Sequence, residues 1–409
     1  MIVTVTLNPA LDVTYDVDTL VVDATNRVAG VSAHAGGKGV NVARLLRLLG
    51  TADGALPALS AGLPAPSGPP TALPASSGLA AGLPGPDGFG RLGAAAAERE
   101  VVALGFAGGT TGGELLADLD RAGIGHAFVA CAGETRRTVA VVDGGAGTVT
   151  MLNEPGPAVT PGEWEALRDR LEGLLPEASA VVLSGSLPPG LPPDAYATLV
   201  RLATGHGVPA VLDAGGAALR LALPAGPEIV KPNAAELAGA LSASAADPAP
   251  PGHAPTSAAR PSGAGAGDPA GPSSLAGGAA WMRGEGARAV VVSDGPRGLY
   301  ADTPDGRWRA VPPEVVGGNP TGAGDAVVAA LTLGLVSGWD WPYALVQAAA
   351  LSAAAVGHPV AGRIDPGPYL GHVGRVRLDH VRTENAPEAQ EGRARLEGAH
   401  EESEGTSCR

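Results

Sequence analysis

The sequence predicts an α/β fold in which helices cover both faces of a mostly parallel β-sheet. Short apolar runs of strand type alternate many times along the chain with longer stretches of helical periodicity. This alternation is typical of parallel sheets, because two parallel strands need a crossover connection, usually a helix. The length of 409 residues suffices for one large domain of this kind or for two ordinary ones.

The expected elements can be placed in chain order. The strands are expected at residues 3–7, 101–106, 180–185, 209–214, 228–233 and 289–295, and the helices at 40–50, 113–123, 193–207, 234–241 and 326–338. In the second helix Leu115, Leu116 and Leu119 form one stripe, which should face the core.

Two stretches interrupt the alternation of strands and helices. Residues 12–35 and 126–153 have a period of two, turn residues and little helical signal. They predict a small accessory sheet beside the main one, and a lid over a ligand site is one use for such a sheet.

Three further segments have compositions that are not typical of a packed core. Residues 51–97 and 242–275 are rich in Pro, Gly, Ser and Ala without apolar periodicity, and the chain from residue 379 onward is charged and polar. Such segments bury too little apolar surface to offset the entropy of ordering the backbone. We therefore expect one domain over residues 1–378 with two disordered insertions, followed by a disordered tail.

Composition excludes several functional classes. The formal net charge is −14 and basic residues form no cluster, which argues against nucleic-acid and anionic-membrane surfaces. Cys131 and Cys408 are the only cysteines, so a disulfide framework and a cysteine-based zinc site are not expected. The N-terminus has the pattern of a strand rather than of a signal peptide. These features predict a reduced, cytoplasmic protein.

Lysine is scarce in this chain, and its positions are informative. The 27 basic residues include only two lysines, Lys38 and Lys231. In a sequence that otherwise uses arginine, a retained lysine indicates a place where a compact, flexible ammonium is needed.

The string GAGD occurs twice, in two different contexts. At residues 265–268 it lies within the Pro/Gly/Ser-rich segment with no strand before it, so no function is expected there. At residues 322–325 it opens a long apolar helix, where the amides of Gly322, Ala323 and Gly324 would form an anion cradle beside Asp325. An ordinary glycine-rich helix start is the alternative interpretation.

Each of the two lysines lies at the start of a further predicted helix. Lys38 and Asn41 follow a glycine pair at the opening of one helix, where they could meet a polyhydroxylated or phosphorylated ligand. After Lys231, Asn233 and Glu236 share one face of a first helical turn, which suits a hydrated magnesium ion. Each feature taken singly is also typical of an ordinary capped helix, and their co-occurrence favours a site.

The ordered set of motifs resembles the ribokinase-like (PfkB-type) carbohydrate kinases, in particular the 1-phosphofructokinase and tagatose-6-phosphate kinase branch. The set is TLNPALD, AGGKGVNVA, LGFAGG, GETR, NEPGP, SGSLPPG, KPNAAEL, VVSDGPRG and NPTGAGD. The resemblance spans residues 1–50 and 98–370. It implies a three-layer α/β/α ribokinase-like fold, a small β-sheet lid that helps to form homodimers, and ATP- and Mg²⁺-dependent phosphorylation of a sugar phosphate.

The resemblance also implies roles for individual residues. Asp325 matches the catalytic base, and the amides at 322–324 match the group that stabilises the transferred phosphoryl. The implied sugar site consists of Asp12, Gly36, Gly37, Lys38 and Asn41; the implied nucleotide site consists of Lys231, Asn233, Ser293, Gly295, Gly298, Gly322 and Gly324; and the implied magnesium contacts are Asn233 and Glu236, through water.

Three more residues are candidates for contact with the substrate. We expect Arg136, together with Lys38, to bind the phosphate that the substrate already carries, since a planar guanidinium suits a tetrahedral dianion. Ser184 and Ser186 are candidate residues that align the substrate. The branch usually has Asn where this chain has Thr138.

Fructose 1-phosphate is the leading substrate, and tagatose 6-phosphate and fructose 6-phosphate are alternatives of the same class. A sugar-phosphate sensor without turnover is the alternative from another class. Retention of Asp325, Asn233 and Glu236 argues against it.

Overall fold

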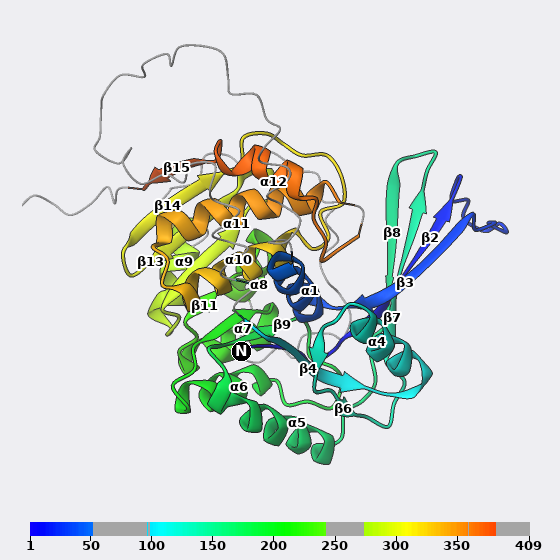
Figure 1. The fold of residues 1–409 in the computed structure, drawn as a ribbon, viewed down its shortest axis with the longest axis horizontal. Coiled ribbons are helices and arrows are strands. Elements are labelled where there is room, and N and C mark those ends of the chain that lie inside the picture. The colour runs from blue at the N-terminus through cyan, green and yellow to red at the C-terminus, as the bar shows by residue number, and fades with distance from the viewer. Residues whose placement is uncertain (52–95, 97–98, 243–273, 359, 382–409) are drawn as a thin grey trace, which may run out of the picture.

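A large twisted sheet with helices on both faces forms the centre of the molecule (Figure 1). The computed structural model describes residues 1–51, 96, 99–242, 274–358 and 360–381. Across the large sheet the order is β15 (Arg377–His380), β14 (Gly306–Val311), β13 (Leu299–Thr303), β12 (Ala289–Ser293), β11 (Ile229–Val230), β10 (Ala210–Asp213), β9 (Ala180–Ser184), β1 (Ile2–Thr6), β4 (Val101–Ala107) and β5 (Gly125–His126), with β6 (Val129–Ala130) also paired to β4.

The strands from β12 to β5 run parallel, and β13, β14 and β15 are added antiparallel at one edge. The core strands are apolar along their length because both of their faces are covered. This confirms the predicted α/β class.

Two helical layers enclose this sheet. One layer contains α1 (Lys38–Thr51), α4 (Gly109–Arg121), α10 (Ala323–Ser337), α11 (Trp341–Val356) and α12 (Pro366–Val373). The other layer contains α5 (Pro161–Leu174), α6 (Ala195–Gly205), α7 (Gly216–Ala222), α8 (Ala234–Ser242) and α9 (Leu275–Gly284). In α4 the side chains of Leu115 and Leu119 are fully buried and Leu116 packs beside them, as the stripe predicted.

Both helices of the candidate site begin at the glycine-rich turns that the sequence marked as helix starts. α1 begins at Lys38 and α10 begins at Ala323, ahead of the apolar stretches at residues 40–50 and 326–338. Glycine-rich first turns carry no apolar side chain, so periodicity alone cannot locate them. Lys38 and Asp325 lie in the first turn of a helix, as the two glycine motifs predicted.

A second, four-stranded sheet projects from the main body (Figure 1). Its order is β3 (Gly30–Gly36), β2 (Ala10–Val17), β7 (Arg136–Asp143) and β8 (Thr148–Asn153). This confirms the small sheet predicted at residues 12–35 and 126–153, with one difference. Residues 125–130 pair with β4 of the large sheet rather than with the lid.

The predicted insertions and tail fall almost entirely outside the described residues. Asp379 and His380, which the sequence assigned to the tail, instead belong to the edge strand β15. In the described ranges no helix combines the length and the hydropathy that a membrane crossing needs.

Candidate active site

The only two lysines of the chain meet at one carboxylate. Lys38 Nζ lies 3.2 Å and Lys231 Nζ lies 3.4 Å from Asp213 Oδ1. Lys38 Nζ also lies 2.9 Å from Glu236 Oε1. Asp213 and Lys231 are almost fully buried. The interpretation of the two lysines as partners in one site therefore holds geometrically, although the sequence did not point to Asp213.

The topology of the sheet brings these groups together. Asp213 ends β10, Lys231 follows β11, and Lys38 begins α1, which packs against β1. The carboxyl ends of parallel strands meet at one edge, which is where open α/β sheets bind ligands. The position of Asp213 near the carboxyl end of the predicted strand 209–214 was the signal that could have identified it.

The charges of this cluster stabilise one another. Burial by itself would lower the pKa of Lys38, but Asp213 and Glu236 outweigh it and raise that pKa above its usual range. Burial would raise the pKa of Asp213, but Lys231 and Lys38 outweigh it and lower that pKa. Lys38 therefore stays protonated at neutral pH and Asp213 stays ionised.

Asp325 stands at the edge of this cluster in the first turn of α10. It is 5% exposed, and its Oδ2 accepts a hydrogen bond of 2.9 Å from Asn41 Nδ2. Burial, reinforced by the charge of Asp213, raises the pKa of Asp325 to about 6. A carboxylate with this pKa is ionised at pH 7 and a stronger proton acceptor than an ordinary aspartate.

The GAGD string opens α10 as predicted, but the amide of Ala323 is not unpaired as expected, because it bonds a carbonyl of the preceding turn. Gly322 precedes the helix with a φ of 88°, and a Cβ there would lie 3.0 Å from the amide nitrogen of Gly362. A left-handed residue in this space has to be glycine. The Ala323 amide donates to the Pro320 carbonyl at 3.2 Å, and Gly324 lies against the Lys231 ammonium.

The lid contributes a further carboxylate, Asp12, which is half-buried. Its side chain lies directly over the Cα of Gly36, where a Cβ would come within 1.9 Å of Asp12 Oδ2. Burial raises the pKa of Asp12 to about 6, although Arg136 and a hydrogen bond from Thr138 oppose this. Asp325 also interacts electrostatically with Asp12, so the lid carboxylate and the carboxylate of α10 belong to one site. Gly37 follows with a φ of 106° and links β3 to α1.

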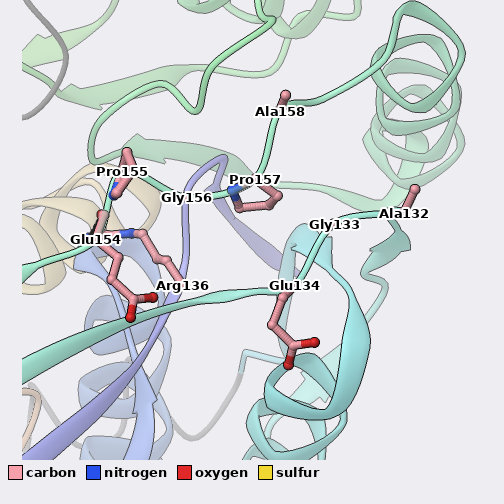
Figure 2. A pocket seen from close by; sticks show the side chains of 9 residues that line it. All are labelled: Ala132, Gly133, Glu134, Arg136, Glu154, Pro155, Gly156, Pro157 and Ala158. Atoms are coloured by element: carbon pink, nitrogen blue, oxygen red, sulfur yellow. Dashed lines mark hydrogen bonds between the residues drawn. The ribbon is translucent and has the colours of Figure 1, made fainter.

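Arg136 begins β7 at the base of the lid. It donates from Nε to the Asn8 carbonyl at 3.1 Å and from Nη1 to the Glu154 carbonyl at 3.3 Å. A hollow of about 550 Å³ lies beside it, between segments 132–136 and 154–158 (Figure 2). Lys38 does not line this hollow. Lys38 therefore bonds Asp213 and Glu236, whereas Arg136 belongs to the lid and bonds main-chain carbonyls. The two side chains do not meet in one hollow, as their predicted joint role would require.

The two serines of SGSLPPG occupy different environments. Ser184 ends β9 and is completely buried, whereas Ser186 is exposed and accepts a hydrogen bond of 3.2 Å from Asn8 Nδ2. Asn8 also donates to the Pro155 carbonyl at 3.0 Å. Asn8, which the sequence analysis did not single out, thus ties the segment after β1 to the segments that follow β8 and β9.

Asn233 and Glu236 form a reciprocal cap at the start of α8. Glu236 Oε2 accepts from the Asn233 amide at 2.9 Å, and Asn233 Oδ1 accepts from the Glu236 amide at 2.8 Å. Within the described ranges no group of three acidic, histidine or cysteine side chains could hold a metal. This donor set fits a magnesium ion that keeps its waters and arrives with nucleotide phosphates, rather than one held by a protein cage.

The predicted nucleotide residues of SDGPRG form a tight turn after β12. Ser293 bridges to Asn233, which links this turn to the start of α8. Gly295 and Gly298 have φ values of 54° and 85°, and Asp294 forms two hydrogen bonds, of 2.6 and 2.7 Å, with Arg297. The turn lies at the same carboxyl edge of the sheet as the lysine cluster.

A buried carboxylate on a glycine-rich helix start, beside paired lysines at the edge of a parallel sheet, is an arrangement suited to phosphoryl transfer. The sequence model of the pfkB family carbohydrate kinases matches residues 89–366. The chain belongs to this family. Family membership and the fold together establish a sugar kinase, and the family implies the use of ATP.

Solved structures of similar fold cover nearly the whole chain. A candidate phosphofructokinase of Staphylococcus aureus is 25% identical, with 94% of this chain and 100% of that chain covered and a TM-score of 0.64. Phosphofructokinase-2 of Escherichia coli in complex with potassium is 24% identical, with 91% of this chain and 97% of that chain covered and a TM-score of 0.67. A candidate 1-phosphofructokinase of Thermotoga maritima is 22% identical, with 93% and 100% covered and a TM-score of 0.67.

The raised pKa of Asp325 predicts that the Asp325→Asn variant is more stable than the wild type at pH 8. A carboxyl whose pKa is raised from 3.8 to about 6 on folding costs stability while it is ionised, and the cost disappears below about pH 4. Each pKa unit corresponds to about 1.4 kcal/mol, and the helix N-terminus returns about 0.3–1 kcal/mol. We expect a gain of about 2–3 kcal/mol at pH 8 in urea unfolding, and none at pH 4.

Asp302→Asn is the matched control for this measurement. Asp302 is equally buried, but its two oxygens bond Arg283 and Arg307 at 2.6 and 2.9 Å. Its neutralisation should lower the free energy of unfolding at pH 8. A loss of stability in both variants at pH 8 would contradict the assignment of Asp325 as an uncompensated charge.

Proposed function

We propose that this sugar kinase transfers the γ-phosphoryl group of ATP to a hydroxyl of a phosphorylated ketohexose, with fructose 1-phosphate as the preferred acceptor and fructose 1,6-bisphosphate as the product. The observation that carries the proposal is Asp325, buried beside Lys38 and Lys231 in the first turn of α10 with a pKa raised to about 6. Phosphoryl transfer needs mainly positioning and charge stabilisation, together with a base that accepts the hydroxyl proton.

Each part of the site has a proposed task. The Asp325 carboxylate accepts the proton of the attacking hydroxyl, and Asn41 orients it through the 2.9 Å hydrogen bond. Asp12 accepts hydrogen bonds from sugar hydroxyls, since its half-buried carboxylate lies on the lid above Gly36. Lys38, Lys231 and the glycine amides of α10 offset the negative charge of the phosphoryl group in flight. A magnesium ion bound with ATP would neutralise phosphate charge.

Arg136 is proposed to bind the phosphate that the substrate already carries. In the described residues only two of its guanidinium donors, Nε and Nη1, have partners, and both partners are main-chain carbonyls. The remaining donors can meet a dianion, and the hollow beside Arg136 offers room for it (Figure 2). Lys38 is engaged by Asp213 and Glu236, so we assign the substrate phosphate mainly to Arg136.

The lid is proposed to carry a homodimer contact. Its described strands and connecting turns expose several large apolar side chains, among them Val22, Val31 and Leu152, which are 81%, 65% and 58% exposed. Side chains of this kind grouped on one projecting sheet favour burial against a partner. A second copy of this chain is the partner that the family resemblance implies.

The substrate assignment is tested by assays on three sugars. The motif set resembles the branch that contains the 1-phosphofructokinases, and with fructose 1-phosphate as the proposed acceptor, kcat/KM measured with ATP and Mg²⁺ should be highest for that sugar. A higher value for fructose 6-phosphate or tagatose 6-phosphate would reassign the substrate, and turnover of none of the three would contradict the proposal.

Replacement of Asp325 by alanine should lower kcat by about three to four orders of magnitude, because one general base contributes roughly 10²- to 10⁴-fold and the site also loses a polar anchor for Asn41. The KM of the sugar phosphate should change little. Asp268→Ala in the other GAGD string is the matched control, and it should leave kcat unchanged. Equal losses in the two variants would refute the separate roles of the two strings.

A further inference from the structure

Four side chains form a polar row across the carboxyl ends of adjacent strands. The register pairs Thr6 of β1 with Ser184 of β9, and Ser184 with Asp213 of β10. The pairing of Leu212 with Val230 continues the row from Asp213 to Lys231. In-register residues of parallel strands point to the same face of the sheet, so these four side chains lie side by side.

The row lies beneath the first turn of α1. A Cβ at Gly39 would lie 2.5 Å from Thr6 Oγ1, so Thr6 faces this helix. Lys38 precedes Gly39 and bonds Asp213 at the third position of the row. The row therefore forms the floor on which the lysine cluster rests.

Three atoms of this floor are buried without a hydrogen-bond partner among the described residues. They are Thr6 Oγ1, Ser184 Oγ and Asp213 Oδ2, in residues that are 2%, 0% and 1% exposed. Buried polar groups are nearly always satisfied, by protein or by ordered water. A single unpaired polar atom can be an accident of packing, but two hydroxyls and a carboxylate oxygen at consecutive positions of one row indicate a shared partner.

The spacing of the strands indicates what that partner is. Neighbouring strands lie about 4.8 Å apart, and among the described residues no direct hydrogen bond joins these side chains. A bridging oxygen about 2.8 Å from each partner fits this gap. A water can donate to a carboxylate and both donate to and accept from a hydroxyl, and buried waters typically satisfy such groups.

We propose that ordered waters bridge Thr6 Oγ1 to Ser184 Oγ and Ser184 Oγ to Asp213 Oδ2, and that Thr6 and Ser184 are positioning residues for phosphoryl transfer. The water on Oδ2 fixes the rotation of the Asp213 carboxylate, which keeps Oδ1 turned toward both lysines. Ser184 is completely buried, so it acts beneath the site through Asp213 rather than by contact with substrate.

The waters are tested by a crystal structure of the full chain at about 1.6 Å resolution. We expect a density peak between each pair of side chains, within about 2.6–3.2 Å of both oxygens, and loss of the peak beside Thr6 in the Thr6→Val variant. Rotated hydroxyls bonded directly to carbonyl oxygens, with no peaks, would overturn the proposal. A peak with four or more oxygens at about 2.4 Å would indicate a cation and would also overturn it.

The positioning role is tested by kinetics, and this half rests on the proposed function. Thr6→Val keeps the shape of the side chain and removes its hydroxyl. Ser184→Ala removes the hydroxyl that stands between Thr6 and Asp213 in the row. We expect kcat to fall about ten-fold in each, as for the loss of a hydrogen bond that supports a charged group, with both KM values within about two-fold. Thr6→Ser, which keeps the hydroxyl, should restore kcat.

Thr332→Val is the matched control, because Thr332 is fully buried and bonds the Val328 carbonyl within α10. It should leave kcat unchanged. If the crystal shows the water peaks but Thr6→Val and Ser184→Ala keep the kcat of the wild type, the positioning role is overturned. Absence of kinase activity in the wild type would instead refute the proposed function, and the crystal would still decide whether the waters are present.

Discussion

The Asp213 carboxylate is the interaction on which the candidate site depends. It holds Lys38 and Lys231, which lie 193 residues apart in the sequence, within 3.4 Å of a single oxygen. With Glu236, which bonds Lys38, it balances the two ammonium groups. Asp325 is then an additional negative charge that this cluster does not compensate, and its raised pKa follows from burial and from the repulsion of Asp213.

The fold supplies this arrangement through the polarity of its parallel strands. β1, β9 and β10 all end at one edge, where α1 and α10 begin with glycine-rich turns. Those turns let the backbone approach closely, and Gly322 is required there by its left-handed conformation and its contact with Gly362. The lid then brings Asp12 and Arg136 to the same edge, from a sheet that shares no strand with the first.

Much of the fold could be predicted because long apolar strands and periodic helices depend on local sequence. The antiparallel strands β13–β15 and the helices α11 and α12 were missed, since α11 is alanine-rich on all sides and shows no stripe. At the site, lysine scarcity and the GAGD string pointed to Lys38, Lys231 and Asp325. Asp213 and Asn8 could not be found in this way, because their partners come from distant segments that only the folded chain brings together.

The most direct test of this account is the pH dependence of kcat in the wild type and in Asp213→Asn. The wild type should lose activity below about pH 6, where Asp325 becomes protonated. In Asp213→Asn the two lysines remain, but the negative charge that repels the Asp325 carboxylate is removed. The pKa of Asp325 should therefore fall, and the acid limb of the kcat profile should move to lower pH. We expect the maximum kcat of this variant to be lower than that of the wild type. An acid limb that stays in place or moves to higher pH would contradict the claim that Asp213 sets the charge balance around Asp325.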